Sequence, residues 1–228
     1  MSDLLSTQSI IAVIGGTGSE GSGLAYRWAH AGYSIVIGSR DPERAKTAAD
    51  DLNRELRLTS VRGMENSEAA REGDVLVLSV PYSAHTSTLE SIKAEAQGKI
   101  LIDVSVPIVP PVTQVHIPPE GSAAQEAHIV LGDQVRVVSA FQNVSAVHLK
   151  DLTTSADCDV LVTGNETEAK AVAIQLAEAA GMRGIDAGVL ANAVVAESLT
   201  PILLGINKRY GIKGAGILIT RLDPNRDH

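Results

Sequence analysis

The feature that most limits what this chain can fold into is a glycine-rich turn close to its N-terminus. Ile10–Gly15 reads IIAVIG, and such a short apolar run is typical of a strand buried on both faces. Ser19–Ala31 follows with apolar residues at helical spacing. Between the two, Gly16, Gly18 and Gly21 fit the pattern G-x-G-x-x-G in the strand–turn–helix context that it requires. The segment predicts a unit whose free backbone N–H groups, at a helix N-terminus, bind the pyrophosphate of a dinucleotide.

Each glycine of this turn has an expected task. Gly16 permits the tight turn, Gly18 lets the backbone approach the pyrophosphate, and Gly21 lets the helix pack close to the strand. Neighbouring hydroxyl groups add hydrogen-bond donors. The candidate cofactor-binding residues of the turn are Gly16, Thr17, Gly18, Ser19, Glu20 and Gly21.

Strand-like and helix-like segments alternate with short connections along the first 140 residues. Further strands are expected near Ser34–Gly38, Thr59–Arg62, Asp74–Val80, Ile100–Asp103 and Arg136–Ala140. Helices are expected near Pro42–Leu56, Ser67–Arg71 and Thr86–Ala96, and from Ser122 onward. This alternation favours an α/β fold, a Rossmann-type doubly wound parallel sheet with right-handed crossovers.

The pattern changes in the second half of the chain. Val104–Pro119 is rich in proline and is expected to be a functional loop or an active-site cover. A smaller C-terminal α/β unit is then expected, and the predicted domains are residues 1–140 and 141–228. Its expected strands are Val160–Thr163, Arg183–Asp186 and Ile217–Arg221, and its expected helices are Thr167–Ala180 and Val194–Tyr210.

Composition and charge exclude several functional classes. A net charge of −8 makes the chain a poor partner for nucleic acid or an anionic membrane. The single cysteine, Cys158, rules out a disulfide within the chain and a thiolate metal site. No targeting segment is recognisable, and no run approaches the roughly 18 unbroken apolar residues of a membrane span. A cytoplasmic location is therefore expected.

The end of the second strand indicates which dinucleotide is bound. A site for NAD places an acidic residue there to bind the ribose 2′-hydroxyl, but this chain has Ser39. Arg40 and Arg44 follow at the start of the next helix, and guanidinium groups bind a 2′-phosphate through paired N–H bonds. Asp41 is expected to cap that helix rather than to pair with either arginine. The sequence therefore predicts NADP(H).

No arrangement for acid–base, nucleophilic or metal chemistry is recognisable. The sequence has no Tyr-x-x-x-Lys pair, no His-Glu-x-x-His motif and no Gly-x-Ser-x-Gly motif. His85 follows the third long strand and is expected on the surface or packed in the core. Hydride exchange between two redox cofactors needs no placed acid or base, because both carry their own electronics. The pattern therefore favours a cofactor-to-cofactor reductase or a protein that only binds a nucleotide.

Four stretches together resemble the coenzyme F420-dependent NADP oxidoreductases. They are the glycine turn continued through Leu24 and Ala25, Val36–Arg40 with Arg44, Ser79–Tyr82 with His85, and Asp186–Ala193 leading to Glu197–Leu203. The resemblance implies a homodimer that moves hydride between NADP(H) and coenzyme F420, a deazaflavin bound between the two domains. It implies cofactor contacts from Val80 and Pro81. It also implies ring-side contacts from Ser105, Val106, Pro107, Gln142, Asn143, Ala146, Gly214, Ala215 and Gly216.

Other acceptors stay open at this point. The chain departs from the pattern of archaeal-type members at Gln142, where they have histidine, and at Ser145, where they have proline. An NADPH-dependent reductase of a flavin, a ferric chelate or an imine is one alternative. A non-enzymatic NADP(H) sensor is the other.

Overall fold

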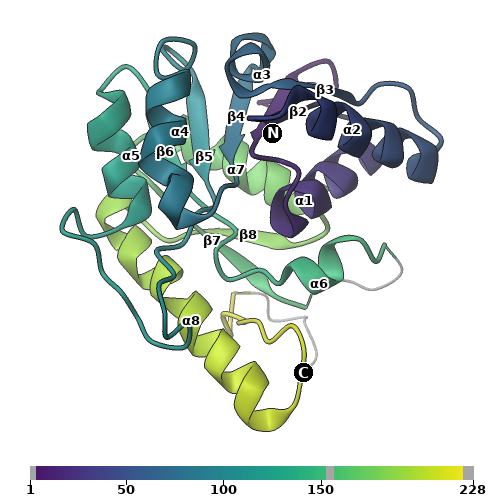
Figure 1. Ribbon diagram of the computed structural model, residues 1–228. Helices are drawn as coiled ribbons and strands as arrows, with labels where there is room; N and C mark the ends of the chain where they lie inside the picture. The colour runs from purple at the N-terminus through teal and green to yellow at the C-terminus, as the bar shows by residue number, and fades with distance from the viewer. Residues whose placement is uncertain (1–3, 153–156, 223–228) are drawn as a thin grey trace.

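The computed structural model describes residues 4–152 and 157–222, which form a central sheet between two layers of helices (Figure 1). Within these residues the sheet has eight strands in the order β3-β2-β1-β4-β5-β6-β7-β8. The strands are β1 (Ile10–Ile14), β2 (Ser34–Ser39), β3 (Arg62–Glu65), β4 (Val75–Leu78), β5 (Ile100–Asp103), β6 (Arg136–Ser139), β7 (Asp159–Gly164) and β8 (Arg183–Asp186).

The helices connect these strands in the expected alternation. They are α1 (Ser19–His30), α2 (Pro42–Leu56), α3 (Asn66–Glu72), α4 (His85–Ile92), α5 (Ala123–Leu131), α6 (Ala146–Leu149), α7 (Thr167–Ala179) and α8 (Ala193–Tyr210). Two short 3₁₀ turns, η1 (Tyr82–Ala84) and η2 (Leu190–Asn192), precede α4 and α8.

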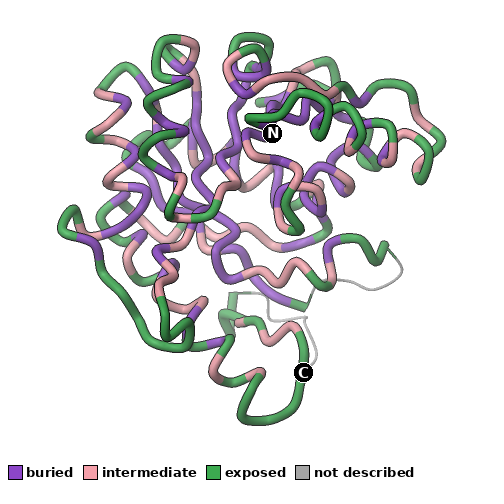
Figure 2. Tube along the Cα trace, viewed as in Figure 1, coloured by how far each residue is buried: buried purple, intermediate pink, exposed green. Residues whose placement is uncertain are grey.

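The strands β1, β2, β4, β5 and β6 are buried on both faces because alternate residues pack into two separate cores. Ile11 and Val13 of β1 face the core formed with α1, α2 and α7. Ala12 and Ile14 face the core formed with α3, α4 and α5. Figure 2 shows the strands as the buried centre of the molecule. Apolar runs rather than alternating patterns are typical of such strands, and this is how the sequence revealed them.

Parallel pairing confirms the doubly wound α/β fold. β1 pairs with β2 on one side and with β4 on the other, so the order of the strands reverses at β1. The parallel part of the sheet then continues through β5 to β6. In open α/β sheets, ligands bind beyond the carboxyl ends of the strands at this reversal.

The C-terminal part extends this sheet. β7 pairs with β6 in antiparallel register, with Val138 opposite Gly164 and Ser139 opposite Thr163. Trp28 of α1 donates its indole N–H to the carbonyl of Leu176 on α7 at 2.8 Å, so the two parts also share a core. The division into domains at residue 140 stays a prediction.

Several boundaries differ from the sequence-based expectation. The strand expected at Thr59–Arg62 lies three residues later, at Arg62–Glu65, where it pairs with β2. The third long strand is limited to Val75–Leu78, and the helix after it ends at Ile92. The strand expected at Ile217–Arg221 is wrong. That segment runs beside Asp159, but the side chain of Asp159 accepts the N–H of Ile219 at 2.6 Å in place of a backbone carbonyl.

The segment 104–119 contains no helix or strand and reaches across to α8, where Thr113 lies beside Gly205. The segment Leu190–Tyr210, which includes α8, is long and apolar enough by length and composition to span a membrane. About a third of it is buried in the protein, a property that core helices share. Its buried residues include the ionisable side chain of Glu197.

Candidate functional site

Two neighbouring cavities lie where the strand order reverses. Both are lined by residues that follow the carboxyl ends of strands, and they share Gly18, Ser79, Val80 and Pro81. The Arg40 cavity, of about 500 Å³, is also lined by Gly15, Thr17, Ser39, Arg40, Asp41, Arg44, Asn66, Ala84 and Thr88. The Gln142 cavity, of about 470 Å³, is also lined by Ser19, Glu20, Tyr82, Val104, Ser105, Val106, Ile108, Phe141, Gln142, Val144 and Thr200.

The glycine turn has the shape of a phosphate-binding turn, with one change in the expected roles. The residue with positive φ is Gly15, at +73°, and not Gly16. A Cβ atom on Gly21 would lie 2.9 Å from the Cα of Gly16, so close packing of helix on strand requires glycine there. A Cβ on Gly18 would meet only the carbonyl of Gly15, at 4.0 Å. The protein's own packing therefore does not require glycine at Gly18, whereas a ligand that touches the backbone would.

The N-terminus of α1 is open to the cavities. Gly18 is its N-cap residue, and no side chain in the described part of the chain caps it. The amide groups of the first turn thus point toward the space that Gly18 and Ser19 line. Asn66, which sequence reasoning missed, fixes the turn by accepting the N–H of Gly15 at 3.2 Å.

The far end of the Arg40 cavity is positively charged. Arg40 and Arg44 are exposed, and neither has an ion-pair partner among the described residues. Asp41 caps α2 instead, because its carboxylate accepts the N–H groups of Glu43 at 3.0 Å and Arg44 at 3.4 Å. This confirms the expected cap and leaves both guanidinium groups available to an anion.

The wall of the Gln142 cavity carries buried polar atoms without partners. Gln142 donates its amide to the carbonyl of Asp103 at 2.7 Å, which leaves its Oε1 without a hydrogen bond among the described residues. The Oγ of Ser105 is buried in the same state. Thr200 of α8 donates to the carbonyl of Gln142 at 2.6 Å. Buried polar atoms without partners are rare in folded proteins, so these two oxygens mark places where a ligand would donate hydrogen bonds.

Glu20 brings a carboxyl group to the same cavity. Its Oε1 is buried and has no hydrogen-bond partner among the described residues. Burial raises the pKa of Glu20 from 4.5 to about 8. The group is therefore neutral at pH 7, and this removes the repulsion that a carboxylate would exert on a phosphate bound at the start of α1.

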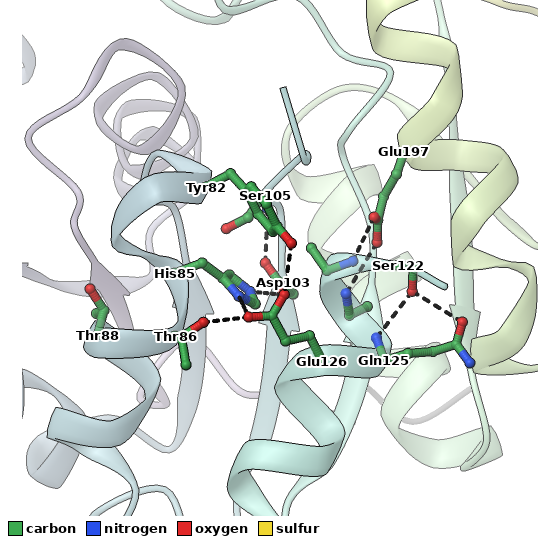
Figure 3. A network of polar contacts seen from close by, with 12 residues as sticks. Tyr82, His85, Thr86, Thr88, Asp103, Ser105, Ser122, Gln125, Glu126 and Glu197 are labelled. Atoms are coloured by element: carbon green, nitrogen blue, oxygen red, sulfur yellow. Dashed lines mark hydrogen bonds and ion pairs between the residues drawn. The ribbon is translucent and has the colours of Figure 1, made fainter. Parts of the chain in front are cut away.

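A buried charged network lies behind the wall (Figure 3). His85 and Asp103 are both fully buried, with Nε2 and Oδ2 2.7 Å apart. Glu126 of α5 accepts hydrogen bonds from Tyr82, at 3.0 Å, and from Thr86. Sequence reasoning missed this network, and the surface alternative for His85 is wrong. A charged residue ending an otherwise apolar strand, as Asp103 ends β5, was the available signal.

Some of the ring-side residues implied by resemblance lie elsewhere. Of that set, Ser105, Val106 and Gln142 line the Gln142 cavity, and Pro107 lies between two of its lining residues. The others line neither cavity; they are Asn143, Ala146, Gly214, Ala215 and Gly216. Their role in binding stays a prediction. No group of three or more possible metal-binding side chains occurs in the described part of the chain.

Comparison with known proteins places this geometry in a family. The family model described as NADP oxidoreductase, coenzyme F420-dependent, matches residues 10–107. The F420-dependent NADP reductase of Methanocaldococcus jannaschii is 44% identical over 93% of this chain and 99% of its own length. That of Methanothermobacter marburgensis is also 44% identical, over 93% and 98%. The crystal structure of a hypothetical protein from Sinorhizobium meliloti has the same fold, with a TM-score of 0.68 at 22% identity over 84% of this chain and 88% of that one. The chain belongs to the family of coenzyme F420-dependent NADP oxidoreductases.

Proposed function

We propose that this chain transfers a hydride between NADP(H) and coenzyme F420. The observation that carries the proposal is the pair of joined cavities at the reversal of the strand order. Among the residues that the structure describes, one end offers two guanidinium groups without ion-pair partners and the other offers buried oxygen atoms without hydrogen-bond partners. Such a space suits two cofactors held end to end, and the names of the two relatives supply their identity.

The Arg40 cavity fits NADP(H). Arg40 and Arg44 would bind the 2′-phosphate, and Ser39 leaves room beside them because it is small and uncharged. The open amide groups at the start of α1 would bind the pyrophosphate, with Thr17 beside them. The selection of NADP(H) over NAD(H) is thus assigned to the two arginines.

The Gln142 cavity fits the second cofactor. When bound, coenzyme F420 supplies a ring that takes up or gives a hydride at carbon, so the protein has only to align two rings and exclude water. The free oxygens of Ser105 and Gln142 would accept hydrogen bonds from polar groups of that ring. Val80, which lines both cavities, and Val106, which lines the Gln142 cavity, would provide apolar surface that excludes water from the rings.

The experiment mixes purified protein with NADPH and oxidised F420 and follows the visible absorption of the deazaflavin. Bleaching with NADPH and little with NADH is the expected result. Free flavin and a ferric chelate serve as alternative acceptors. Turnover with either of them but not with F420, in protein shown to bind NADPH, would refute the proposed acceptor.

Three further expectations, about the domains, the oligomeric state and the location of the protein, belong to the same proposal. Residues 141–228 form a small domain that closes the Gln142 cavity, two copies form a homodimer, and the protein acts in the cytoplasm. Thr200 and Gln142 support the first, because both come from this part of the chain and line the cavity. The homodimer rests on family resemblance, and sedimentation velocity tests it. A single species of 23.8 kDa would refute it.

A further inference from the structure

We propose that His85 is a positioning residue for hydride transfer, because its buried contact with Asp103 fixes two polar groups that line the Gln142 cavity. This inference rests on the function proposed above. It concerns residues that line neither cavity and that the sequence alone did not bring together.

The pair lies directly behind the cavity wall. His85 begins α4, three residues after Tyr82, and Asp103 ends β5, two residues before Ser105. Neither side chain is exposed, and Nε2 of His85 lies 2.7 Å from Oδ2 of Asp103. Figure 3 shows His85, Asp103 and Ser105 in this arrangement, with Glu126 beside them.

Asp103 connects His85 to both polar groups of the wall. Its second carboxylate oxygen, Oδ1, accepts the backbone N–H of Ser105 at 2.8 Å. Its backbone carbonyl accepts the side-chain amide of Gln142 at 2.7 Å. That bond orients the amide of Gln142 and leaves its Oε1 free. The contact with His85 thus fixes Asp103, which in turn holds the backbone of Ser105 and the side-chain amide of Gln142 in place.

Ionisable groups face His85 from four neighbouring elements. Asp103 faces it from β5, Glu126 from α5 with Oε1 3.7 Å from Nδ1, Tyr82 from η1, and Glu197 from α8. Burial lowers the pKa of His85, but Asp103 and Glu126 outweigh burial and raise it above its ordinary value. Burial raises the pKa of Tyr82 to about 12 and that of Glu197 to about 8.

The pH dependence follows from these charges. Below its raised pKa, His85 is protonated and its contact with Asp103 is an ion pair. As pH rises through that pKa, Asp103 is left buried without its cation, and the segment at Ser105 and the amide of Gln142 are held less tightly. The turnover number should therefore fall on the alkaline side through loss of the His85–Asp103 ion pair, whereas ionisation of Glu20 at alkaline pH acts on NADPH binding instead.

The first test compares His85→Gln with a matched control, His128→Gln, whose histidine is partly exposed on α5. In His85→Gln we expect kcat for F420 reduction to fall about 10- to 100-fold, because small misplacements of reacting groups have effects of this size. The alkaline fall of kcat should disappear, and the KM for NADPH should stay within about twofold. A wild-type pH profile in His85→Gln, or an equal effect in His128→Gln, would overturn the proposal.

A second test does not depend on turnover. Nuclear magnetic resonance of the wild-type protein without cofactors follows the titration of the His85 ring together with the backbone amide of Ser105 and the side-chain amide of Gln142. We expect both amides to shift with the titration of His85, and Glu126→Gln to move that titration to lower pH. If the chemical shifts of both amides stay constant while His85 titrates, the proposal is overturned. Wild-type protein that fails to reduce F420 would instead refute the proposed function.

Discussion

Arg40 and Arg44 allow cofactor selection to be separated from folding. Both side chains are exposed and line the Arg40 cavity, and Asp41 binds the backbone of α2 rather than either guanidinium group. Each arginine can give a 2′-phosphate at least one charged hydrogen bond of about 1.5–3 kcal/mol. Since 1.4 kcal/mol is a factor of ten, the double variant Arg40→Ala/Arg44→Ala should lose ~10²–10⁴ in NADPH affinity. NADH has no 2′-phosphate, so its affinity should change little.

The same substitutions should leave the folded state intact. Arg44 is the third residue of α2, where a positive charge faces the positive end of the helix. Its removal should therefore raise the free energy of unfolding by about 0.3–1 kcal/mol at low ionic strength. A loss of cofactor affinity accompanied by a gain in stability would separate a binding role from a structural one.

The assay measures kcat/KM for NADPH and NADH with F420 as acceptor, together with thermal unfolding of the protein without cofactors. Arg54→Ala is the matched control, because Arg54 lies on the same helix and pairs with Asp51 far from the cavity lining. Equal losses for NADPH and NADH would refute the reasoning, as would a large NADPH effect in Arg54→Ala.

Three further predictions concern the glycine turn and α1. Between pH 4.5 and about 8, the folded state keeps a proton on Glu20 that the unfolded chain has lost, so the free energy of unfolding should fall as pH rises through this range. Glu20→Gln should remove that fall. The variant should be more stable than wild type by about 1–3 kcal/mol at pH 8 but not at pH 4.5. Urea unfolding at both pH values checks this, and an equal difference at both would contradict it. Gly21→Ala should lower stability by about 1–3 kcal/mol because of the 2.9 Å contact with the backbone of Gly16, whereas Gly18→Ala should keep wild-type stability and lose NADPH affinity. Thermal melting and fluorescence titration separate the two, and unchanged binding in Gly18→Ala would count against a phosphate at that turn. Arg27→Met should cost about 3 kcal/mol or more, since the buried guanidinium group donates to the carbonyls of His148, Leu149, Asp151 and Ala180. Urea unfolding tests this too. An unfolding curve identical to that of wild type would contradict the prediction and show that water replaces these bonds.

The parallel part of the sheet could be predicted because its strands are short apolar runs and its helices carry local signals. Asp41 before Pro42 marked the start of α2, and Ser122 marked the start of α5. β3 was misplaced because its sequence, RGME, has no apolar run, and its position is set by pairing with β2. Nothing local in the sequence distinguishes the antiparallel pairing of β7 from a parallel one.

The candidate site was predictable where one segment carries its own signal. The glycine turn and the two arginines are of this kind, because their spacing along the chain is enough to predict how they lie around a bound dinucleotide. The partnership of His85 and Asp103 was not predictable, since the two residues lie 18 positions apart and meet only when β4 and β5 pair. The free oxygens of Ser105 and Gln142 required the structure as well, because a missing partner is visible only in three dimensions.

The anchoring of α1 has a consequence for how the molecule can move. Its first turn borders both cavities, while Arg27 and Trp28, further along the same helix, bond to the carbonyls of residues 148, 149, 151, 176 and 180. A hinge at residue 140 would have to break these bonds and the pairing of β6 with β7 together. Rigid-body opening would therefore require many bonds to break at once. We expect the segment 104–119 to move during cofactor exchange instead, because it contains no helix or strand and contributes Val106 and Ile108 to the Gln142 cavity.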